Sequence, residues 1–548
     1  MEYQAILFDT RSIQHYIFSG SRLKTNIGAS YLVDRIYDDV LLDVLKSDAL
    51  FGADGVDDTT WKNDDAPDWQ QQETPCRIAY FGGGNALVLL KDDAKARAKD
   101  IVTAFTKALL VRAPGLRTGA AIGSLRLASD GTIGAEDGID DLTRLVHQLK
   151  ETQSTIFPQV TLPYTGLTLC CPESDAPAAA WDDDERRSYA WDVERKLCAD
   201  RKAGGEDPPA ERELLQKLRS VLPEGERRMF LDGYAFPQSF SQLGQKTTEN
   251  YLAIVHIDGN NMGVRFARCR TLTERKNLSR RIRATTIRAF AALVRAIIRT
   301  REAGADAFLA RHVQDGRDLL PIRPLVLGGD DMTFVCAAKT AFTYTPYLMR
   351  AMNADGIASC AGIAILKSSY PFSRGYEMAE ELCGAAKTAM RKTPGDSCWL
   401  DFAFLHGEQP PTLEGLRAQE YRTAYRDGEV PASLHAGPYR VDADESDAHA
   451  YQNLLRATAE LPRCLPMNKI KELRSVLAHG AHEQQAFLSQ LAYLSSKNAA
   501  HAHLPAIPAW KGYKNGLWQA GRTPFVDAIE LMDYYVPQLD ETMEGGAR

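Results

Sequence analysis

The sequence lacks several features that mark specialised classes of protein. In 548 residues, no apolar run approaches the roughly 20 residues of a transmembrane helix, and the N-terminus, MEYQAILFDT, is typical of a strand and not of a signal peptide. The formal charge of −7 gives no overall electrostatic case for nucleic-acid binding, which would need a local basic patch. These absences predict a cytoplasmic, globular protein with no membrane partner.

Cysteine patterns are also missing. The 10 cysteines are scattered through predicted strands, helices and loops, and none forms a CxxC pair, so a disulfide framework is not expected. Cys170, Cys171 and Cys198 could be taken for zinc ligands, but a structural zinc site needs four suitably spaced ligands. We therefore favour ordinary thiols over a zinc site.

The most informative feature that is present is an internal repeat. The first copy has predicted strands at 3–8, 77–81, 86–90 and 118–124, with helices at 36–45 and 92–111 and a further helix at 140–152. The second copy has strands at 251–257, 323–327, 332–336 and 359–366, with helices at 273–300 and 340–352. Both copies follow the order βαββαβ, which is typical of a ferredoxin-like fold.

The repeat sets the domain organisation that we expect. The chain is too long for one hydrophobic core, and its composition, 44% hydrophobic and 25% charged, is that of a globular protein. We predict an α+β protein in which residues 1–164 and 249–408 form the two ferredoxin-like modules. Residues 165–248 would be an irregular insert with one or two helices, and residues 409–548 a mainly helical C-terminal domain.

The two copies differ at the turn between their middle strands. The second copy reads LGGDDMTFV, so Gly328 and Gly329 are followed by two acids, Asp330 and Asp331. Adjacent carboxylates repel one another, and a divalent cation such as Mg²⁺ or Mn²⁺ would relieve that repulsion. An acidic turn exposed to water is the alternative interpretation.

A third acid favours the metal site. Asp258 ends the first strand of the second copy, and in a βαββαβ sheet this strand lies beside the GGDD hairpin. Asp258, Asp330 and Asp331, with the backbone carbonyl of Gly259, could then hold two Mg²⁺ or Mn²⁺ ions. Two metal ions held in this way support phosphoryl or nucleotidyl transfer.

Two cations lie downstream of the acids. Lys387 and Arg391 are four residues apart on a predicted helix and therefore share one face of it. Arg391 could hold a triphosphate through a bidentate contact and Lys387 could act as a point charge, although a solvated basic face is the simpler alternative.

These motifs carry a resemblance. IDGNNMG (257–263), LGGDDMTFV, SCAGIAILKSSYPFSRGYEMAEELCGAAK and, in the first copy, FDTRSIQHYIFSGSRLKTNIGASYL with FGGGNALVLL resemble the large polymerase-cyclase subunit of type III CRISPR effector complexes. More distantly, the second copy is similar to diguanylate cyclases. The resemblance implies two facing palm domains that each hold an ATP, with the GGDD palm joining them into cyclic oligoadenylate, an antiviral second messenger.

The resemblance also assigns roles to the first copy. Gly84 and Asn85 stand where the second copy has its two acids, so the first palm would bind a nucleotide without catalysis. Its binding residues would be Asp9, Gly83, Gly84 and Asn85, with the glycines letting a nucleotide approach bare backbone.

Some parts of the family pattern are missing. No His-Asp dipeptide occurs in the chain and the first palm strand begins at residue 3, so DNA cleavage by the family's nuclease domain is not expected. The family's cysteine-rich zinc element is reduced to Cys170 and Cys171. Asn260 occupies a position that is often acidic.

Our leading hypothesis is therefore a metal-dependent nucleotidyltransferase that uses ATP, with a downstream effector sensing the product. One alternative is a non-catalytic RNA- or nucleotide-binding scaffold that assembles with RNA or other CRISPR-type subunits. Its arginine-rich stretch from Arg265 to Arg288 could follow a phosphate backbone, although such a stretch is also typical of a soluble helix. Another is a cyclase that uses GTP or mixed nucleotides, because no motif identifies the base.

Overall fold

The computed structural model describes the chain from 1 to 548 except residues 48–49, 60, 62–73, 83, 155–165, 184, 202–205, 247–248, 408–411, 428–429, 498–501, 514 and 546–548. The chain divides into two compact units. Unit 1 comprises Met1–Arg227, Asn261–Ile287 and Leu325–Asp330, and unit 2 comprises Arg228–Asn260, Arg288–Pro324 and Asp331–Arg548. The division passes through helix α10 (Leu272–Glu302) and strand β14 (Ile322–Gly328).

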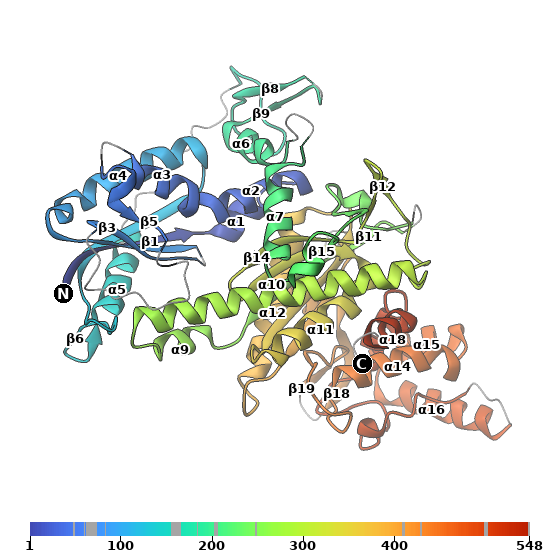
Figure 1. Ribbon diagram of the computed structural model, residues 1–548. Coiled ribbons are helices and arrows are strands. Elements are labelled where there is room, and N and C mark those ends of the chain that lie inside the picture. The colour runs from blue at the N-terminus through green and yellow to red at the C-terminus, as the bar shows by residue number, and fades with distance from the viewer. Residues whose placement is uncertain are drawn as a thin grey trace. The chain divides into compact units, whose positions relative to one another are not determined.

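Unit 1 contains one large sheet with helices on both of its faces (Figure 1). Its strands are β1 (Glu2–Arg11), β2 (Val56–Asp57), β3 (Cys76–Gly82), β4 (Asn85–Leu90), β5 (Arg117–Arg126), β6 (Ala135–Glu136), β7 (Ile139–Asp140), β8 (Ala180–Asp182) and β9 (Arg187–Tyr189). Its helices are α1 (Ile13–Phe18), α2 (Leu23–Arg35), α3 (Leu42–Lys46), α4 (Ala98–Arg112), α5 (Asp141–Ser154), α6 (Trp191–Ala199), α7 (Pro209–Ser220), α8 (Glu224–Arg227) and α9 (Met262–Ala267).

The five-stranded sheet of unit 1 has the order β2-β3-β4-β1-β5, with β1 antiparallel to both neighbours. Side chains alternate along β1, so one face presents Tyr3, Ala5 and Leu7 to the leucines of α5. The other face presents Phe8, whose ring centroid lies 5.1 Å from that of Phe105 on α4. Figure 1 shows α4 and α5 on opposite sides of this sheet.

Unit 2 is built around a six-stranded sheet of order β14-β15-β11-β16-β17-β20. Its strands are β10 (Tyr234–Ala235), β11 (Tyr251–Gly259), β12 (Val313–Gln314), β13 (Arg317–Leu319), β15 (Asp331–Ala337), β16 (Ser359–Lys367), β17 (Trp399–Leu405), β18 (Arg422–Asp427), β19 (Val430–Ser433) and β20 (Tyr439–Arg440). Its helices are α11 (Ala338–Ala354), α12 (Phe372–Met390), α13 (Leu413–Glu420), α14 (Tyr451–Cys464), α15 (Met467–Ala478), α16 (Ala481–Ser496), α17 (Phe525–Leu531) and α18 (Pro537–Gly545).

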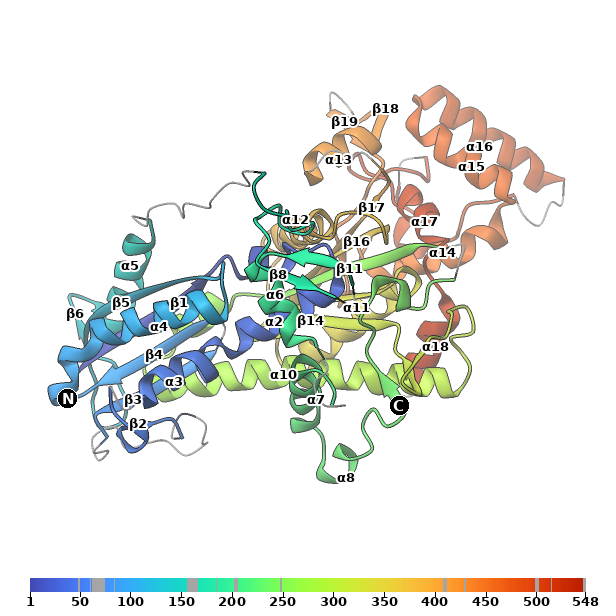
Figure 2. The same cartoon turned by 90° about the horizontal axis from the view of Figure 1, so that it is seen from above.

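Helices α11 and α12 cover opposite faces of the second sheet (Figure 2). The register of β16 and β17 pairs Ile363 with Phe402 on one face, where the ring of Phe342 from α11 lies 5.4 Å from Phe402. On the other face α12 crosses Gly362 so closely that a Cβ there would lie 2.0 Å from the carbonyl oxygen of Ala379. Glycine at this position therefore fixes how deeply α12 seats on the sheet.

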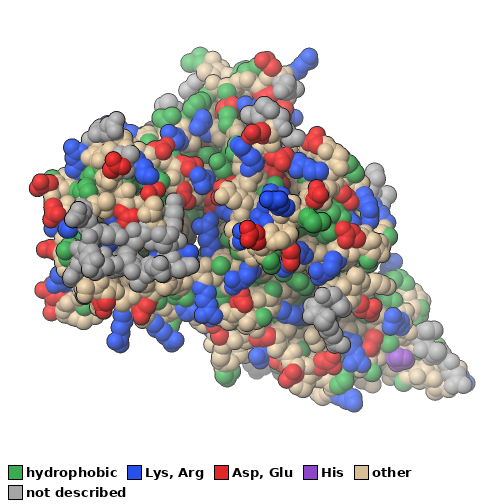
Figure 3. Space-filling model, viewed as in Figure 1, with side chains coloured by type: hydrophobic (Ala, Val, Ile, Leu, Met, Phe, Trp, Pro, Cys, Tyr) green, Lys and Arg blue, Asp and Glu red, His purple; other side chains and the backbone are tan. Residues whose placement is uncertain are grey.

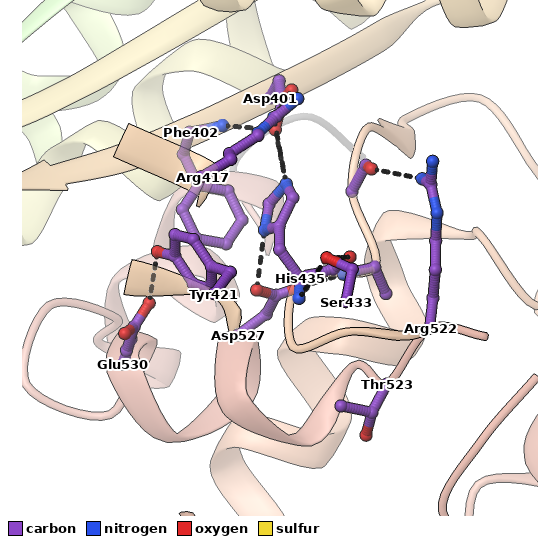
Figure 4. A network of polar contacts seen from close by, with 12 residues as sticks. Asp401, Phe402, Arg417, Tyr421, Ser433, His435, Arg522, Thr523, Asp527 and Glu530 are labelled. Atoms are coloured by element: carbon purple, nitrogen blue, oxygen red, sulfur yellow. Dashed lines mark hydrogen bonds and ion pairs between the residues drawn. The ribbon is translucent and has the colours of Figure 1, made fainter. Parts of the chain in front are cut away.

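A buried polar network ties the C-terminal part of unit 2 to the sheet. Figure 4 shows His435 between Asp401 of β17 and Asp527 of α17. Its Nε2 lies 3.0 Å from Asp401 Oδ1 and its Nδ1 lies 2.8 Å from Asp527 Oδ1. Arg417 of α13 also binds Asp401. No motif in the sequence indicated this network.

The structure confirms the mixed α+β fold class. The order of the four central strands in each sheet, β3-β4-β1-β5 and β14-β15-β11-β16, is the order that a βαββαβ unit gives. The bounds of the four predicted segments stay predictions. In the C-terminal region, the expected helices are joined by the hairpin β18–β19 and by β20, which extends the second sheet.

One helix boundary was wrong. The sequence predicted a helix over 36–45, whereas helical structure begins with α2 at Leu23 and continues through a π-helical segment, Ile36–Leu41, into α3. Helix α2 also makes a close backbone approach that apolar periodicity does not encode. A Cβ at Gly28 of α2 would lie 1.8 Å from the carbonyl oxygen of Lys196 on α6.

The insert contains no zinc site within the part that the structure describes. Cys171 lies fully buried among Tyr189, Ala190 and Val193, where it serves as a small apolar side chain. Cys198 donates to Glu194 on its own helix.

Of the described helices, none combines the length and the apolarity that crossing a membrane requires. On the face drawn in Figure 3, acidic and basic side chains are interspersed. On the arginine-rich helix α10, Arg288 Nη2 donates to Asp355 Oδ2 at 2.7 Å, which pairs this arginine with an acid.

Candidate functional site

Two of the predicted acids face each other across neighbouring strands of unit 2. Strand β11 is buried along its length and ends in Asp258 and Gly259, while β15 begins at Asp331. Asp258 and Asp331 are register partners in this antiparallel pair. Partners in register project from the same face of a sheet, so both carboxylates lie on the face that α12 covers.

Lys387 closes this face. It lies on the last turn of α12, and its ammonium forms an ion pair with the Asp258 carboxylate. The contact depends on the close seating of α12 over Gly362, because Gly362 lies on the strand next to Asp258. The sequence predicted a triphosphate contact for Lys387, and that role stays a prediction; the structure places its ammonium against Asp258. Arg391 follows as the exposed residue that caps α12.

The surroundings of Asp331 are polar and half-buried. His256 Nε2 lies 3.8 Å from Asp331 Oδ1, and His256 Nδ1 lies 3.1 Å from the hydroxyl of Thr333. Burial raises the pKa of Glu380 on α12; the nearby His256 lowers it and Asp331 raises it. Burial likewise raises the pKa of Tyr376, whose ring stacks edge-on with His256 at 5.7 Å. Asp331 thus lies among polar groups from β11 and α12.

The hairpin tip directs the two adjacent acids differently. Gly328 ends β14, and Gly329 has a φ of 33°, a left-handed conformation that favours glycine. The carbonyl oxygen of Gly329 accepts a hydrogen bond from Thr286 Oγ1 at 2.7 Å, which fixes the turn. Asp330 belongs to unit 1, where it lines a cavity, while Asp331 lies beside Asp258 in unit 2.

The cavity of unit 1 has a volume of about 460 Å³, which is within the range of small-molecule sites. It lies at the end of β1, beside the β3–β4 hairpin, and α5 and α10 provide its walls. The residues that line it are Leu7, Asp9, Tyr80, Gly82, Asn85, Val146, Leu149, Lys150, Gln153, Phe266, Arg275, Ser279, Ile282, Gly329 and Asp330. The cavity thus contains Asp9 and Asn85 of the first copy together with Asp330 of the second.

The first hairpin partly matches the expectation for a bare glycine tip. Asp9 pairs in register with Asn85. Gly84 has a φ of 78°, as a glycine turn requires. A Cβ there would lie 2.5 Å from Ile13 Cδ1, so the Ile13 side chain occupies the space beside Gly84. Gly83, a predicted binding residue, lies outside the described residues.

The metal prediction can be tested against the donor atoms. Two opposed carboxylates are hard oxygen ligands of the kind that Mg²⁺ and Mn²⁺ prefer, so their chemistry fits a divalent cation. Among the described residues, however, no group of three or more Asp, Glu, His or Cys side chains is close enough together to hold a metal ion. The ammonium of Lys387 stands against Asp258 in place of a third ligand.

Asn260 takes a structural role. Its side chain is 1% exposed, and its Nδ2 donates to the carbonyl oxygen of Ser397 at 2.9 Å. Gly259 pairs with Ser359 in the sheet. The Asn260 amide therefore anchors the end of β11 to the segment that precedes β17.

The comparison with protein families now identifies this module. Residues 251–393 match the family Cas10/Cmr2, second palm domain. The chain resembles the large subunit of type III CRISPR complexes. The matched palm domain runs from the start of β11 to just beyond Arg391, so it contains Asp258, Asp331 and Lys387.

Two solved structures show a similar fold, that of Csm1. Csm1 from T. onnurineus is 15% identical over 97% of this chain and 70% of that chain, with a TM-score of 0.52. An apo Csm1–Csm4 cassette is 16% identical over 100% of this chain and 70% of that chain, also with a TM-score of 0.52. A Csm1–Csm4 cassette with pppApA is 16% identical over 71% of this chain, with a TM-score of 0.42; the chain covers 53% of that protein. No curated protein sequence matches.

Sequence reasoning missed the groups that hold the acids in place. Gln153 of α5 donates from Nε2 to Asp9 Oδ2 at 2.9 Å, as Lys387 of α12 binds Asp258 in unit 2. His256 could have been noticed, because it precedes Asp258 by two positions and therefore shares its face of the strand. Gln153 gave no such signal.

Proposed function

We propose that the protein is a nucleotidyltransferase of the GGDD palm type. It joins nucleoside triphosphates, with ATP the favoured substrate, into a cyclic or short linear oligonucleotide and releases pyrophosphate. The observation that carries this proposal is the register pairing of Asp258 with Asp331 beneath Lys387, within the part of the chain that matches the second palm domain.

Asp258 and Asp331, with Asp330 and the carbonyl of Gly259, would hold two Mg²⁺ or Mn²⁺ ions. Bound there, the ions supply charge neutralisation for a phosphate and favour ionisation of a hydroxyl. Lys387 would move from Asp258 to the triphosphate, with Arg391 beside it on the exposed end of α12.

In the proposed step, the 3′ hydroxyl oxygen of one nucleotide attacks the α-phosphorus of another. The new bond forms as the bond to pyrophosphate breaks, and the hydroxyl proton passes to water. Unit 1 would present the attacking nucleotide from its cavity, where Asp9 and Asn85 stand in place of the paired acids. We therefore propose that unit 1 is a palm domain that binds without catalysing.

Partners follow from the same resemblance. One structural relative assembles with Csm4, and we propose that this chain likewise joins CRISPR-type subunits, with RNA, in antiviral defence. The product would act on a downstream effector that senses it.

The test is incubation of the full chain with each labelled nucleotide and Mg²⁺ or Mn²⁺, with and without RNA, followed by mass analysis. We expect pyrophosphate and oligonucleotide from the unmodified chain and at least a 100-fold loss in Asp330→Ala/Asp331→Ala, the order of effect expected when charge stabilisation of the transition state is lost. The exposed Asp232→Asn is the matched control. Undiminished product from the double variant would refute the assignment.

A second candidate is a nucleotide-binding scaffold without catalysis. It is favoured by the ion pair of Lys387 with Asp258 and by the absence of a three-ligand group among the described residues. Nucleotide binding with no product under any of these conditions would support the scaffold.

A further inference from the structure

The cavity of unit 1 contains one side-chain amide that is held in a single orientation. Gln153 is 9% exposed and lies on the last turn of α5. Its Nε2 donates to Asp9 Oδ2 at 2.9 Å, and its backbone carbonyl accepts from Arg11 at 2.8 Å. A Cβ at Gly119, the register partner of Asp9, would lie 2.8 Å from Gln153 Nε2. Glycine therefore leaves the room that this amide occupies.

Asp9 determines which atom of the amide remains for a ligand. An ionised carboxylate only accepts hydrogen bonds, so the NH₂ group of Gln153 must face Asp9 and the amide cannot flip without placing two acceptors together. Within the described residues, no donor reaches Gln153 Oε1, and this oxygen is not sealed from solvent. The cavity therefore offers a fixed acceptor.

We propose that Gln153 selects the base of the nucleotide bound in unit 1 and that Asp9 is its positioning residue. Oε1 accepts from the exocyclic amine of adenine, while the second N–H of Nε2 is available to the ring nitrogen N7. Guanine presents an oxygen at the corresponding position, which would oppose Oε1 as a second acceptor. This inference rests on the proposed function, since it concerns the nucleotide that unit 1 presents.

The rest of the cavity suits a purine nucleotide. Leu149 and Val146 lie one and two turns before Gln153 on α5 and provide an apolar wall for a flat ring. Lys150 and Arg275 provide cations for phosphates at the same cavity. Burial raises the pKa of Tyr80 to about 12, so the phenol stays neutral beside the base.

The contrast between the copies supports a reading role. At the corresponding place in unit 2, the Asp258 carboxylate binds a cation, Lys387, which donates but never accepts. Replacing that cation by Gln153 removes a charge and adds one acceptor. The first copy has thus exchanged a phosphate partner for a group that can distinguish bases.

The test is calorimetric titration of the full chain with ATP, with GTP and with purine riboside 5′-triphosphate, which lacks the amine. The chain carries Lys387→Ala/Arg391→Ala to remove the phosphate partners of unit 2, and the titrations are repeated without these changes. We expect ATP to bind about 10-fold more tightly than purine riboside triphosphate and about 5- to 150-fold more tightly than GTP.

Three variants separate reading from folding. In Gln153→Ala the three affinities should converge to within about twofold, and in Asp9→Asn the preference for ATP over GTP should fall because the amide can then reorient. Gln148→Ala, on the same helix but outside the cavity, should leave the ratios unchanged. An unchanged ATP preference in Gln153→Ala would overturn this inference alone. Absence of nucleotide binding by the unmodified chain would overturn it together with the proposed function.

Discussion

Protonation of His435 should make the stability of unit 2 depend on pH. Burial lowers the pKa of this imidazole, but Asp527 and Asp401 outweigh that effect and raise the pKa from 6.5 to about 9. In the same network, burial raises the pKa of Asp401 whereas Arg417 and His435 lower it, with a net decrease, so Asp401 stays ionised at neutral pH. Both ring nitrogens donate to carboxylates, which requires the charged form (Figure 4).

The magnitude follows from linkage between protonation and folding. One pKa unit corresponds to about 1.4 kcal/mol, so a rise from 6.5 to about 9 contributes about 3 kcal/mol. Because the folded pKa is raised, this contribution is complete below pH 6.5 and is lost as the pH rises to about 9 and beyond. Tyr439 and Tyr421 do not titrate in this window, since burial raises their pKa values well above the usual range.

Urea unfolding of the full chain, followed by tryptophan fluorescence between pH 6.5 and 9, measures this effect. The free energy of unfolding of the transition that includes Trp518 should fall by about 3 kcal/mol across the window. His435→Leu should lower it by about 3–5 kcal/mol at pH 6.5 and remove most of the pH dependence, because two buried carboxylates lose their partner.

The exposed His479→Gln is the matched control and should leave the pH profile unchanged. A profile that stays flat in the unmodified chain would refute the assignment of a charged His435. So would a slope that survives in His435→Leu.

Three further changes should have distinct outcomes. Gly362→Ala should destabilise the chain by about 1–3 kcal/mol in urea unfolding and reduce product formation, because the new methyl meets the backbone of α12 at 2.0 Å; Gly384→Ala, with open space on the same helix, should be neutral or stabilising. Arg301→Met should cost about 3–5 kcal/mol by the same measurement, since Asp306, 6% exposed, would keep only its longer contact with Arg311 at 3.7 Å and Asp318 would lose its contact with the buried guanidinium; equal stability would contradict this. Lys387→Ala should lower pyrophosphate release about 10- to 100-fold with little change in unfolding, and unchanged release would argue against its role at the phosphates.

Much of the architecture was readable from local patterns. Buried strands such as β11 and β16 are short apolar runs with distinct ends, and the sequence placed each within a few residues. The order of elements predicted the two strand orders, because βαββαβ units permit few arrangements. The shared helix face of Lys387 and Arg391 was also predicted, because residues four apart on a helix lie on one side of it.

Other features depend on contacts between segments that are distant in sequence. The neighbours of a side chain such as Gln153 or His435 are set by how a helix seats on a sheet, and no spacing rule encodes this. The different positions of Asp330, which lines the cavity, and Asp331, which lies beside Asp258, also depend on tertiary structure. Asp330 lies in the hairpin turn whereas Asp331 begins β15, so two neighbouring carboxylates that look like one site in the sequence have different surroundings in the fold.

The sequence by itself thus determined the fold class, the repeat and the acidic end of the second sheet, because these follow from periodicity and residue type. Only the tertiary structure decided that Lys387 binds Asp258, that Gln153 is held by Asp9 and that a cavity lies beside the first copy. Local patterns fix strands and helices, whereas packing between them fixes which polar atoms meet.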